Sequence, residues 1–311
     1  MSKPNVIIAG SIGLDSVKTP FGSVENEIGG SATFSSIACS IFAKPALLSI
    51  VGNDFPKKKL ELLEKKGIDL SSLQYSGKPN MRWVAHYDYD VNTAHTDLFE
   101  ANAFEDLKPI LPEKLKDAEF VSLGNWFPER QLELLKVFNK KPLLSIGDTI
   151  KYYIDNYPKQ VLEVVKASSI ALLNDGEARQ LFNTTSLLKA GKEILKLDSD
   201  YAIIKKGEHG CVMFSKPSSV KEGRASHFSC PGYPLENVVD PTGCGDSFAG
   251  ALLGYLSNSK DFSEKNMRKA IVIASAVASF NAESHSFYRL MEVTKKDVNE
   301  RVKELKEIAR F

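Results

Sequence analysis

Short apolar runs that end at a glycine, an asparagine or a charged residue recur along this chain, and a segment with helical character follows most of them. Continuous apolar runs of this length are typical of strands that are buried on both faces of a parallel sheet. Their alternation with helices predicts a doubly wound, mostly parallel α/β sheet with helices on both faces. The expected strands are residues 6–9, 47–51, 120–123, 143–146, 170–173 and 201–204, and the expected helices are residues 31–43, 56–66, 129–139, 156–167, 175–182 and 187–197.

Two segments interrupt this rhythm. Residues 81–99 are rich in aromatic and β-forming residues and lack a helical period, so they predict a hairpin outside the main sheet. Residues 14–28 form a second extended excursion. The two segments could close over the ligand crevice as a lid or remain ordinary surface hairpins, and the pattern alone leaves both open. For His86 and His95, which lie in the first excursion, an exposed or stacking role is expected rather than metal binding.

Length, charge and cysteine usage narrow the class of protein. A chain of 311 residues predicts a single α/β domain over residues 1–311. Its net charge of +1 gives no basic field that would indicate nucleic acid or an anionic membrane as a partner, so local groups must hold any bound anion. The apolar runs are too short for a signal peptide or a membrane span. Because the four cysteines are scattered and show no metal-type spacing, a reducing, cytoplasmic setting is expected.

The segment Asp240-Pro241-Thr242-Gly243-Cys244-Gly245-Asp246 is the strongest candidate for a chemical site. Gly243 and Gly245 allow a tight turn that exposes successive N–H groups at the start of a helix, which is an anion cradle. A bound phosphate would repel the Asp246 carboxylate, so we expect Asp246 to accept the proton of a hydroxyl that attacks the phosphorus. The alternative is structural, with Asp246 as a helix cap behind a plain tight turn.

Three further segments support a phosphate site, and each has a structural alternative. Asn174 and Glu177 open a helix after a strand, where Glu177 can hold a magnesium-bound water; the same spacing also fits a capping box. Residues 205–210 place two lysines beside a glycine turn. The lysines could bind nucleotide phosphates, or the segment could be a charged hairpin without that role. Gly29-Gly30 precedes an early helix and allows a polar substrate to lie against the backbone.

In their order and spacing, these segments resemble the PfkB (ribokinase-like) family of carbohydrate and nucleoside kinases, and the resemblance runs nearly end to end. Residues 240–246 are similar to the family signature D-T-x-G-A-G-D, and residues 174–177 match its N-x-x-E motif. Residues 207–210 match its G-x-x-G turn, and Gly29-Gly30 resembles its N-terminal di-glycine. Residues 10–15 resemble the opening strand with its substrate-binding aspartate.

The resemblance implies a kinase that transfers the γ-phosphate of ATP to a hydroxyl of a small sugar, nucleoside or polyol. Asp246 would be the catalytic base, and the amides of Gly243, Cys244 and Gly245 would form the anion hole. A lid over about residues 14–28 and 80–100 would close over the substrate and could also form a homodimer interface. The implied ATP- or phosphate-binding residues are Asn174, Lys205, Gly207, Gly210 and Thr242, the implied substrate-binding residues are Asp15, Gly29 and Gly30, and Glu177 would bind Mg²⁺ through water.

Arg82, in the predicted hairpin, is a further candidate for contacting substrate. The implied cofactors are ATP and Mg²⁺, and the resemblance leaves room for a monovalent cation. The chain departs from the family pattern at Pro241, at Cys244 and after Gly30, where the asparagine that many sugar kinases carry four residues later is absent. The acceptor therefore stays open.

The sequence lacks the motifs of two rival classes of protein. No G-x-G-x-x-G of a dinucleotide-binding oxidoreductase follows the first strand, and no G-x-x-x-x-G-K-[ST] phosphate loop occurs. A catalytically inactive sugar- or nucleotide-binding sensor on the same fold is the remaining alternative. Such a sensor would be expected to lose Asp246, which is intact here.

Overall fold

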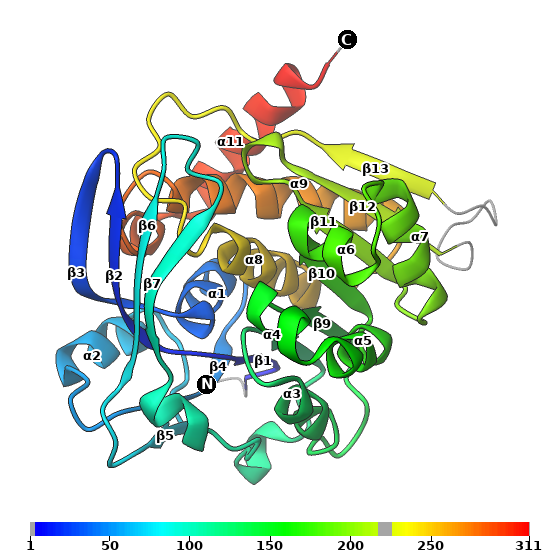
Figure 1. The fold of residues 1–311 in the computed structure, drawn as a ribbon. Helices are drawn as coiled ribbons and strands as arrows, with labels where there is room; N and C mark the ends of the chain where they lie inside the picture. Colours follow the sequence, from blue (N-terminus) through cyan, green and yellow to red (C-terminus); the bar gives the residue numbers. More distant parts are fainter. Residues whose placement is uncertain (1–3, 217–225, 311) are drawn as a thin grey trace.

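The computed structural model describes residues 4–216 and 226–310, and it contains two separate sheets (Figure 1). The main sheet has nine strands in the order β13-β12-β11-β10-β9-β8-β1-β4-β5. These strands are β1 (Val6–Ala9), β4 (Pro45–Val51), β5 (Leu73–Tyr75), β8 (Phe120–Leu123), β9 (Leu144–Asp148), β10 (Ile170–Asn174), β11 (Tyr201–Lys205), β12 (Cys211–Ser215) and β13 (Ser226–Cys230).

The six strands expected from the apolar runs are all present, and they pair in parallel with their neighbours in this group. Three further strands were not expected: β5, β12 and β13. The strand β12 pairs antiparallel with β11 and with β13, and β13 forms the edge of the sheet, where exposed residues alternate with more buried ones. The edge strand β13 carries no long apolar run because an edge strand is buried less completely than a central one, whereas β12 is largely buried and does contain a short apolar run.

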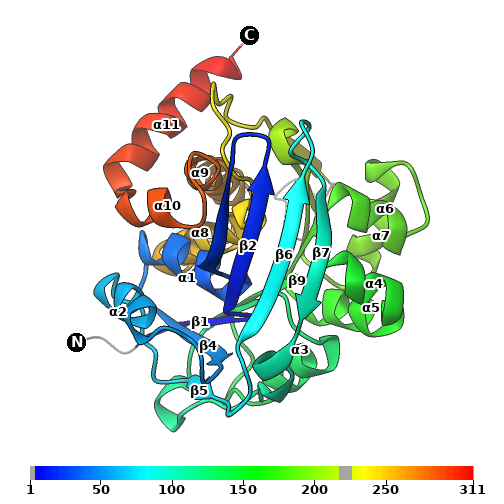
Figure 2. The same cartoon turned by 60° about the vertical axis from the view of Figure 1, so that its left-hand side comes forward.

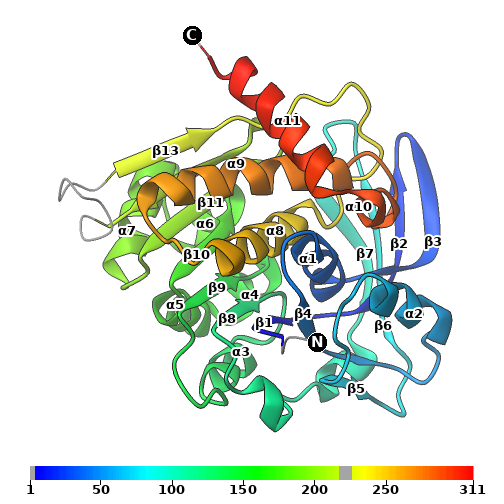
Figure 3. The same cartoon turned by 180° about the vertical axis from the view of Figure 1, so that it is seen from behind.

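Helices cover both faces of the main sheet, as the alternation predicts (Figure 3). Buried side chains of α1, α8 and α9 pack with those of β1 and β4 in one core, whereas α3 and α5 contribute to a second core on the other face. The helices are α1 (Ser31–Ser40), α2 (Lys57–Lys65), α3 (Pro128–Leu135), α4 (Lys151–Asn156), α5 (Pro158–Ala167), α6 (Asp175–Leu181), α7 (Leu187–Lys196), α8 (Cys244–Ser259), α9 (Glu264–Asn281), α10 (Tyr288–Glu292) and α11 (Lys295–Ile308), with short 3₁₀ turns η1 (Asn102–Asp106), η2 (Glu113–Leu115) and η3 (Gly207–His209).

The two excursions form one four-stranded sheet, which we call the lid sheet (Figure 2). Its order is β3-β2-β6-β7, and β2 pairs in parallel with β6, which joins the first excursion to the second. The alternative of two unconnected surface hairpins is therefore wrong. The strands are β2 (Gly13–Thr19), β3 (Gly22–Gly29), β6 (Met81–Tyr87) and β7 (Ala94–Glu100).

Across the part of the chain that the structure covers, no helix has both the length and the apolar character that crossing a membrane would take.

Candidate active site

Three neighbouring strands of the main sheet deliver polar side chains to one edge. Asp148 ends β9, Asn174 ends β10 and Lys205 ends β11. The parallel register pairs Asn174 with Lys205 and sets Asp148 beside Leu172, so all three residues lie at the carboxyl ends of adjacent strands. Ligands of open α/β sheets bind at this edge.

The glycine turn before α8 has the predicted form. Gly243 is the N-cap of the helix and adopts the left-handed conformation, with φ of 78°. A side chain there would also collide with the ring of Phe34, whose nearest atom lies 2.4 Å from the position of a Cβ. Asp246 lies in the first turn and does not cap the helix, so the structural alternative for Asp246 is wrong.

The amides of this turn are unequally available. The Cys244 N–H donates to the carbonyl oxygen of Pro241 at 3.2 Å, which commits one of the three predicted donors. Gly245 faces the lysine that ends β11, because a Cβ on Gly245 would lie 3.0 Å from the Lys205 Nζ. The start of α8 and the Lys205 ammonium therefore border the same space, and together they favour an anion there.

Three carboxylates surround this lysine. Lys205 Nζ lies 3.1 Å from Asp148 Oδ2, and the charges of Glu177 and Asp246 also act on it. Burial, together with the nearby Asp148 charge, raises the pKa of Asp246 to about 7. Burial likewise raises the pKa of Glu177 to about 8, although Lys205 opposes the shift. Carboxyl groups with pKa values raised in this way ionise less readily than usual unless a further cation binds beside them.

Asn174 and Glu177 form the capping box that the sequence left as an alternative. The Glu177 N–H donates to Asn174 Oδ1, and the Asn174 N–H donates to Glu177 Oε2, each at 2.8 Å. The box is confirmed, and it also fixes the Glu177 side chain beside the charged cluster. Glu177 is 7% exposed, so its second oxygen is held in a largely buried position.

The hairpin alternative for residues 205–210 is also confirmed, because β11 and β12 pair antiparallel around η3. Gly207 and Gly210 both have positive φ in this turn. The turn meets the lid sheet: Asn92 Nδ2 donates to Glu208 Oε1 at 3.3 Å, and a Cβ on Gly207 would lie 2.4 Å from Asn92 Oδ1. The side chain of Lys205 still reaches the carboxylates described above.

Asp15 lies on β2 of the lid sheet and is 6% exposed. The Gly30 N–H hydrogen-bonds to its carboxylate, but Oδ1 is buried and has no hydrogen-bond partner in the described part of the chain. A Cβ on Gly29 would lie 1.8 Å from Asp15 Oδ2, so the first glycine of the pair makes room for this carboxylate. Burial raises the pKa of Asp15 to about 7, and the charges of Asp240 and Asp246 add to the effect.

Two residues at the site were missed by the sequence reasoning. Asp148 carried a visible signal, since it ends an apolar strand, but it belongs to no motif. Tyr87 carried none: its hydroxyl lies 3.1 Å from the Thr242 hydroxyl and links the lid sheet to the glycine turn. Arg82, by contrast, pairs with Asp54 at 2.9 Å on an exposed part of the lid sheet and does not join the cluster.

The carboxylate cluster offers hard oxygen ligands, which suit Mg²⁺. We expect Mg²⁺ to raise the melting temperature of the protein more at about pH 8 than at about pH 5. The raised pKa values of Asp246 and Glu177 stabilise the folded state at low pH, and this contribution is lost as the pH rises through about 7 and 8. A cation bound to the ionised groups restores it. Thermal unfolding with and without Mg²⁺ measures the difference.

Glu177→Gln provides the matched variant, because glutamine can keep the capping box while losing the charge. In this variant, Mg²⁺ should raise the melting temperature at about pH 8 by less than it does in the unaltered protein. If Mg²⁺ raised the melting temperature of the unaltered protein equally at both pH values, the prediction would be wrong.

Comparison with known proteins places this geometry in a family. The family model for pfkB family carbohydrate kinases matches residues 9–293. The chain is 26% identical over 266 residues to the cytidine kinase of Thermococcus kodakarensis, which covers 84% of this chain and 91% of that protein. It is 27% identical over 244 residues to the nucleoside kinase of Methanocaldococcus jannaschii, which covers 76% of this chain and 73% of that protein.

The fold is shared with solved structures. One, assigned provisionally as a ribokinase II of E. coli and in complex with ATP and Mg²⁺, superposes with a TM-score of 0.75 at 18% identity. The match covers 97% of this chain and 99% of that one, and at this identity it shows the ribokinase-like fold alone. Because the family match spans the chain almost end to end, this protein belongs to the pfkB family of carbohydrate kinases and is a kinase that phosphorylates a hydroxyl group.

Proposed function

We propose that the protein transfers the γ-phosphate of ATP to the ribose hydroxymethyl group of a nucleoside, with Asp246 as the general base. The observation that carries the proposal is the position of Asp246, which lies one residue after Gly245 at the start of α8 and beside Lys205. A base must lie next to the place where the phosphate is held.

The proposed binding of the phosphate donor, ATP, depends on the glycine turn. The γ-phosphate would lie against the free amides at the start of α8 and near the Lys205 ammonium, where charge developing on its oxygens is stabilised. Asp148 and Glu177 supply oxygen ligands for Mg²⁺, directly or through water, and a bound Mg²⁺ would neutralise charge on the phosphates. Lys205 is held in place by its ion pair with Asp148.

The acceptor side rests on Asp15. Its unpaired Oδ1 can accept a hydrogen bond from a substrate hydroxyl, and the Asp246 charge is near enough to contribute to the raised pKa of Asp15. In the reaction, the acceptor hydroxyl gives its proton to Asp246 while its oxygen bonds to the γ-phosphorus. The bond between that phosphorus and the bridging oxygen breaks, and ADP leaves.

Two facts favour a nucleoside over a free sugar as the acceptor. The relatives with wide coverage are a cytidine kinase and a nucleoside kinase. In addition, the position where many sugar kinases carry a hydroxyl-binding asparagine is Phe34, which is buried against Gly243 and offers no hydrogen bond. Sugar recognition by that route is therefore lost here.

ADP release across a panel of nucleosides, free sugars and inositols tests the proposal, with the phosphorylated product identified by mass spectrometry. We expect one or more nucleosides to give a 5′-monophosphate and ADP in equal amounts. Turnover of free sugars alone would overturn the nucleoside acceptor and leave the kinase intact. Ligand binding without ADP from any compound would favour the sensor alternative.

A further inference from the structure

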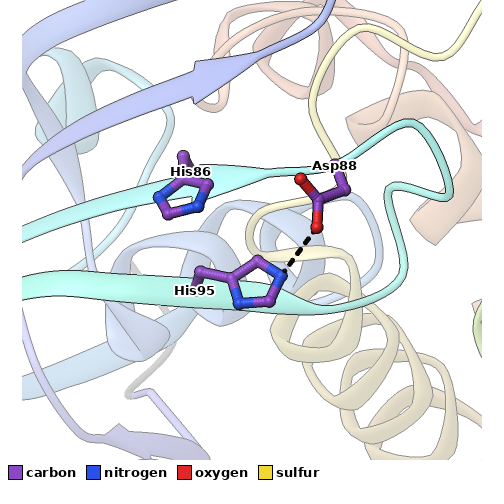
Figure 4. A group of neighbouring side chains, drawn as sticks. All are labelled: His86, Asp88 and His95. Atoms are coloured by element: carbon purple, nitrogen blue, oxygen red, sulfur yellow. Dashed lines mark hydrogen bonds and ion pairs between the residues drawn. The ribbon is translucent and has the colours of Figure 1, made fainter.

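A second cluster of ligand-type side chains lies on the lid sheet, away from the glycine turn. His86, Asp88 and His95 each offer one ligand atom, and these three atoms lie within 4.8 Å of one another (Figure 4). None of the roles assigned above uses them. Their side chains are between about two fifths and three quarters exposed, so an ion in solution can reach them.

The hairpin geometry explains why the group converges. His86 on β6 pairs directly with His95 on β7, and the two rings stack with their centroids 5.0 Å apart. Side chains two residues apart on a strand share a face, so Asp88 follows His86 onto the same side. Tyr87, between them, points to the opposite side, where it contacts Thr242.

A fourth residue, Asp97, contacts one of the two histidines. Nδ1 of His86 lies 2.9 Å from the carboxylate oxygens of Asp97, which leaves Nε2 of His86 available as a ligand. The register of β6 and β7 shifts just before this point, which adds Asp97 to the strand as an extra residue. A carboxylate that holds the second nitrogen of a histidine is the usual outer support of a metal ligand.

We propose that His86, Asp88 and His95 bind one divalent transition-metal ion of the Zn²⁺ class, with Asp97 orienting His86. His95 Nε2 lies 3.1 Å from Asp88 Oδ2. Two ligand atoms of a four-coordinate zinc ion, with bonds of about 2.0–2.1 Å, lie about 3.3 Å apart. These two atoms, which hydrogen-bond to each other here, are therefore close to the spacing of two ligands of one ion, and His86 would be the third protein ligand, with water in the fourth position.

The donor set separates this site from the nucleotide site. Two imidazoles and a carboxylate select Zn²⁺, Ni²⁺, Co²⁺ or Cu²⁺ over Mg²⁺, whereas Asp148, Glu177 and Asp246 offer oxygen alone. An ion here would tie β6 to β7 across the hairpin, directly beside Tyr87. Its structural consequence is a stiffer end of the lid sheet.

The test is equilibrium dialysis of untagged protein against Zn²⁺, with Mg²⁺ in large excess to occupy the oxygen site. We expect one Zn²⁺ per chain, binding at least tenfold weaker in His86→Ala and in His95→Ala, and roughly tenfold weaker in Asp97→Asn. His227→Ala, which removes an exposed histidine from β13, is the matched control and should bind like the unaltered protein.

Two spectroscopic readouts locate the ion. Co²⁺ should give visible absorption bands that His95→Ala loses, and Zn²⁺ should slow amide hydrogen exchange in residues 84–98 of the unaltered protein alone. Zn²⁺ binding that is unchanged in both histidine variants would overturn the proposal, as would binding by the unaltered protein that is no tighter than that of a variant carrying both His86→Ala and His95→Ala. Circular dichroism checks that each variant is folded.

Discussion

Replacing Asp246 with asparagine should lower kcat by roughly two orders of magnitude or more, while the affinity for ATP stays close to its normal value. The carboxylate is partly buried, and its pKa of about 7 suits a base that works near neutral pH. Asparagine has the same shape but cannot take the hydroxyl proton. It also removes a negative charge that repels the phosphates, so nucleotide binding has no reason to weaken.

The measurements are kcat from ADP release and the dissociation constant of ATP from calorimetry. Asp198→Asn is a suitable control because Asp198 is exposed, pairs with Lys216 at the surface and has a positive φ that asparagine tolerates. The control should keep full activity. Near-normal turnover in Asp246→Asn would remove Asp246 from the role of base.

Replacing Asp15 with asparagine should lower kcat/KM for the acceptor by roughly 10- to 100-fold, which corresponds to the loss of a charged hydrogen bond worth about 1.5–3 kcal/mol. The new side chain can still accept from the Gly30 N–H through its oxygen. At the position of Oδ1, however, it presents an N–H₂ group in place of an acceptor. A substrate hydroxyl then meets a donor where it needs an acceptor.

This variant separates the two halves of the site. The affinity for ATP should be unchanged, because Asp15 lies on the lid sheet and not on the glycine turn. An equal loss of ATP affinity would indicate a general disturbance of the crevice. Unchanged kcat/KM for the acceptor would exclude Asp15 from substrate binding, whatever the outcome for Asp246.

Much of the scaffold was predictable because its signals are local. Each parallel strand in the centre of the main sheet can be recognised in the sequence by its apolar run, since both of its faces are buried. The glycine turn before α8 was predictable for the same reason, because a left-handed N-cap at Gly243 needs glycine whatever surrounds it. The edge strand β13 was missed because one partner and partial exposure leave no comparable run, whereas β12 has two partners and a short apolar run of the same kind and was missed despite that signal.

Other features stay predictions. These are the single domain over residues 1–311, the cytoplasmic location, a monovalent cation and a homodimer through the lid sheet. The edge strand β7 is exposed along its whole length in this chain, with Leu98 and Phe99 nearly half exposed. A partner copy could therefore reach it.

The sequence by itself determined the family, the central sheet and the order of the motifs, because motif spacing and apolar periodicity are properties of neighbouring residues. Only the tertiary structure decided which side chains meet. Asp148 joins Lys205 because β9 and β11, more than fifty residues apart in the chain, end at the same edge of the sheet on either side of β10, and Tyr87 meets Thr242 because the lid sheet lies against the turn. The cross-strand pairing of His86 with His95 likewise depends on register. Contacts of this kind are set by packing between distant segments, and no local pattern encodes them.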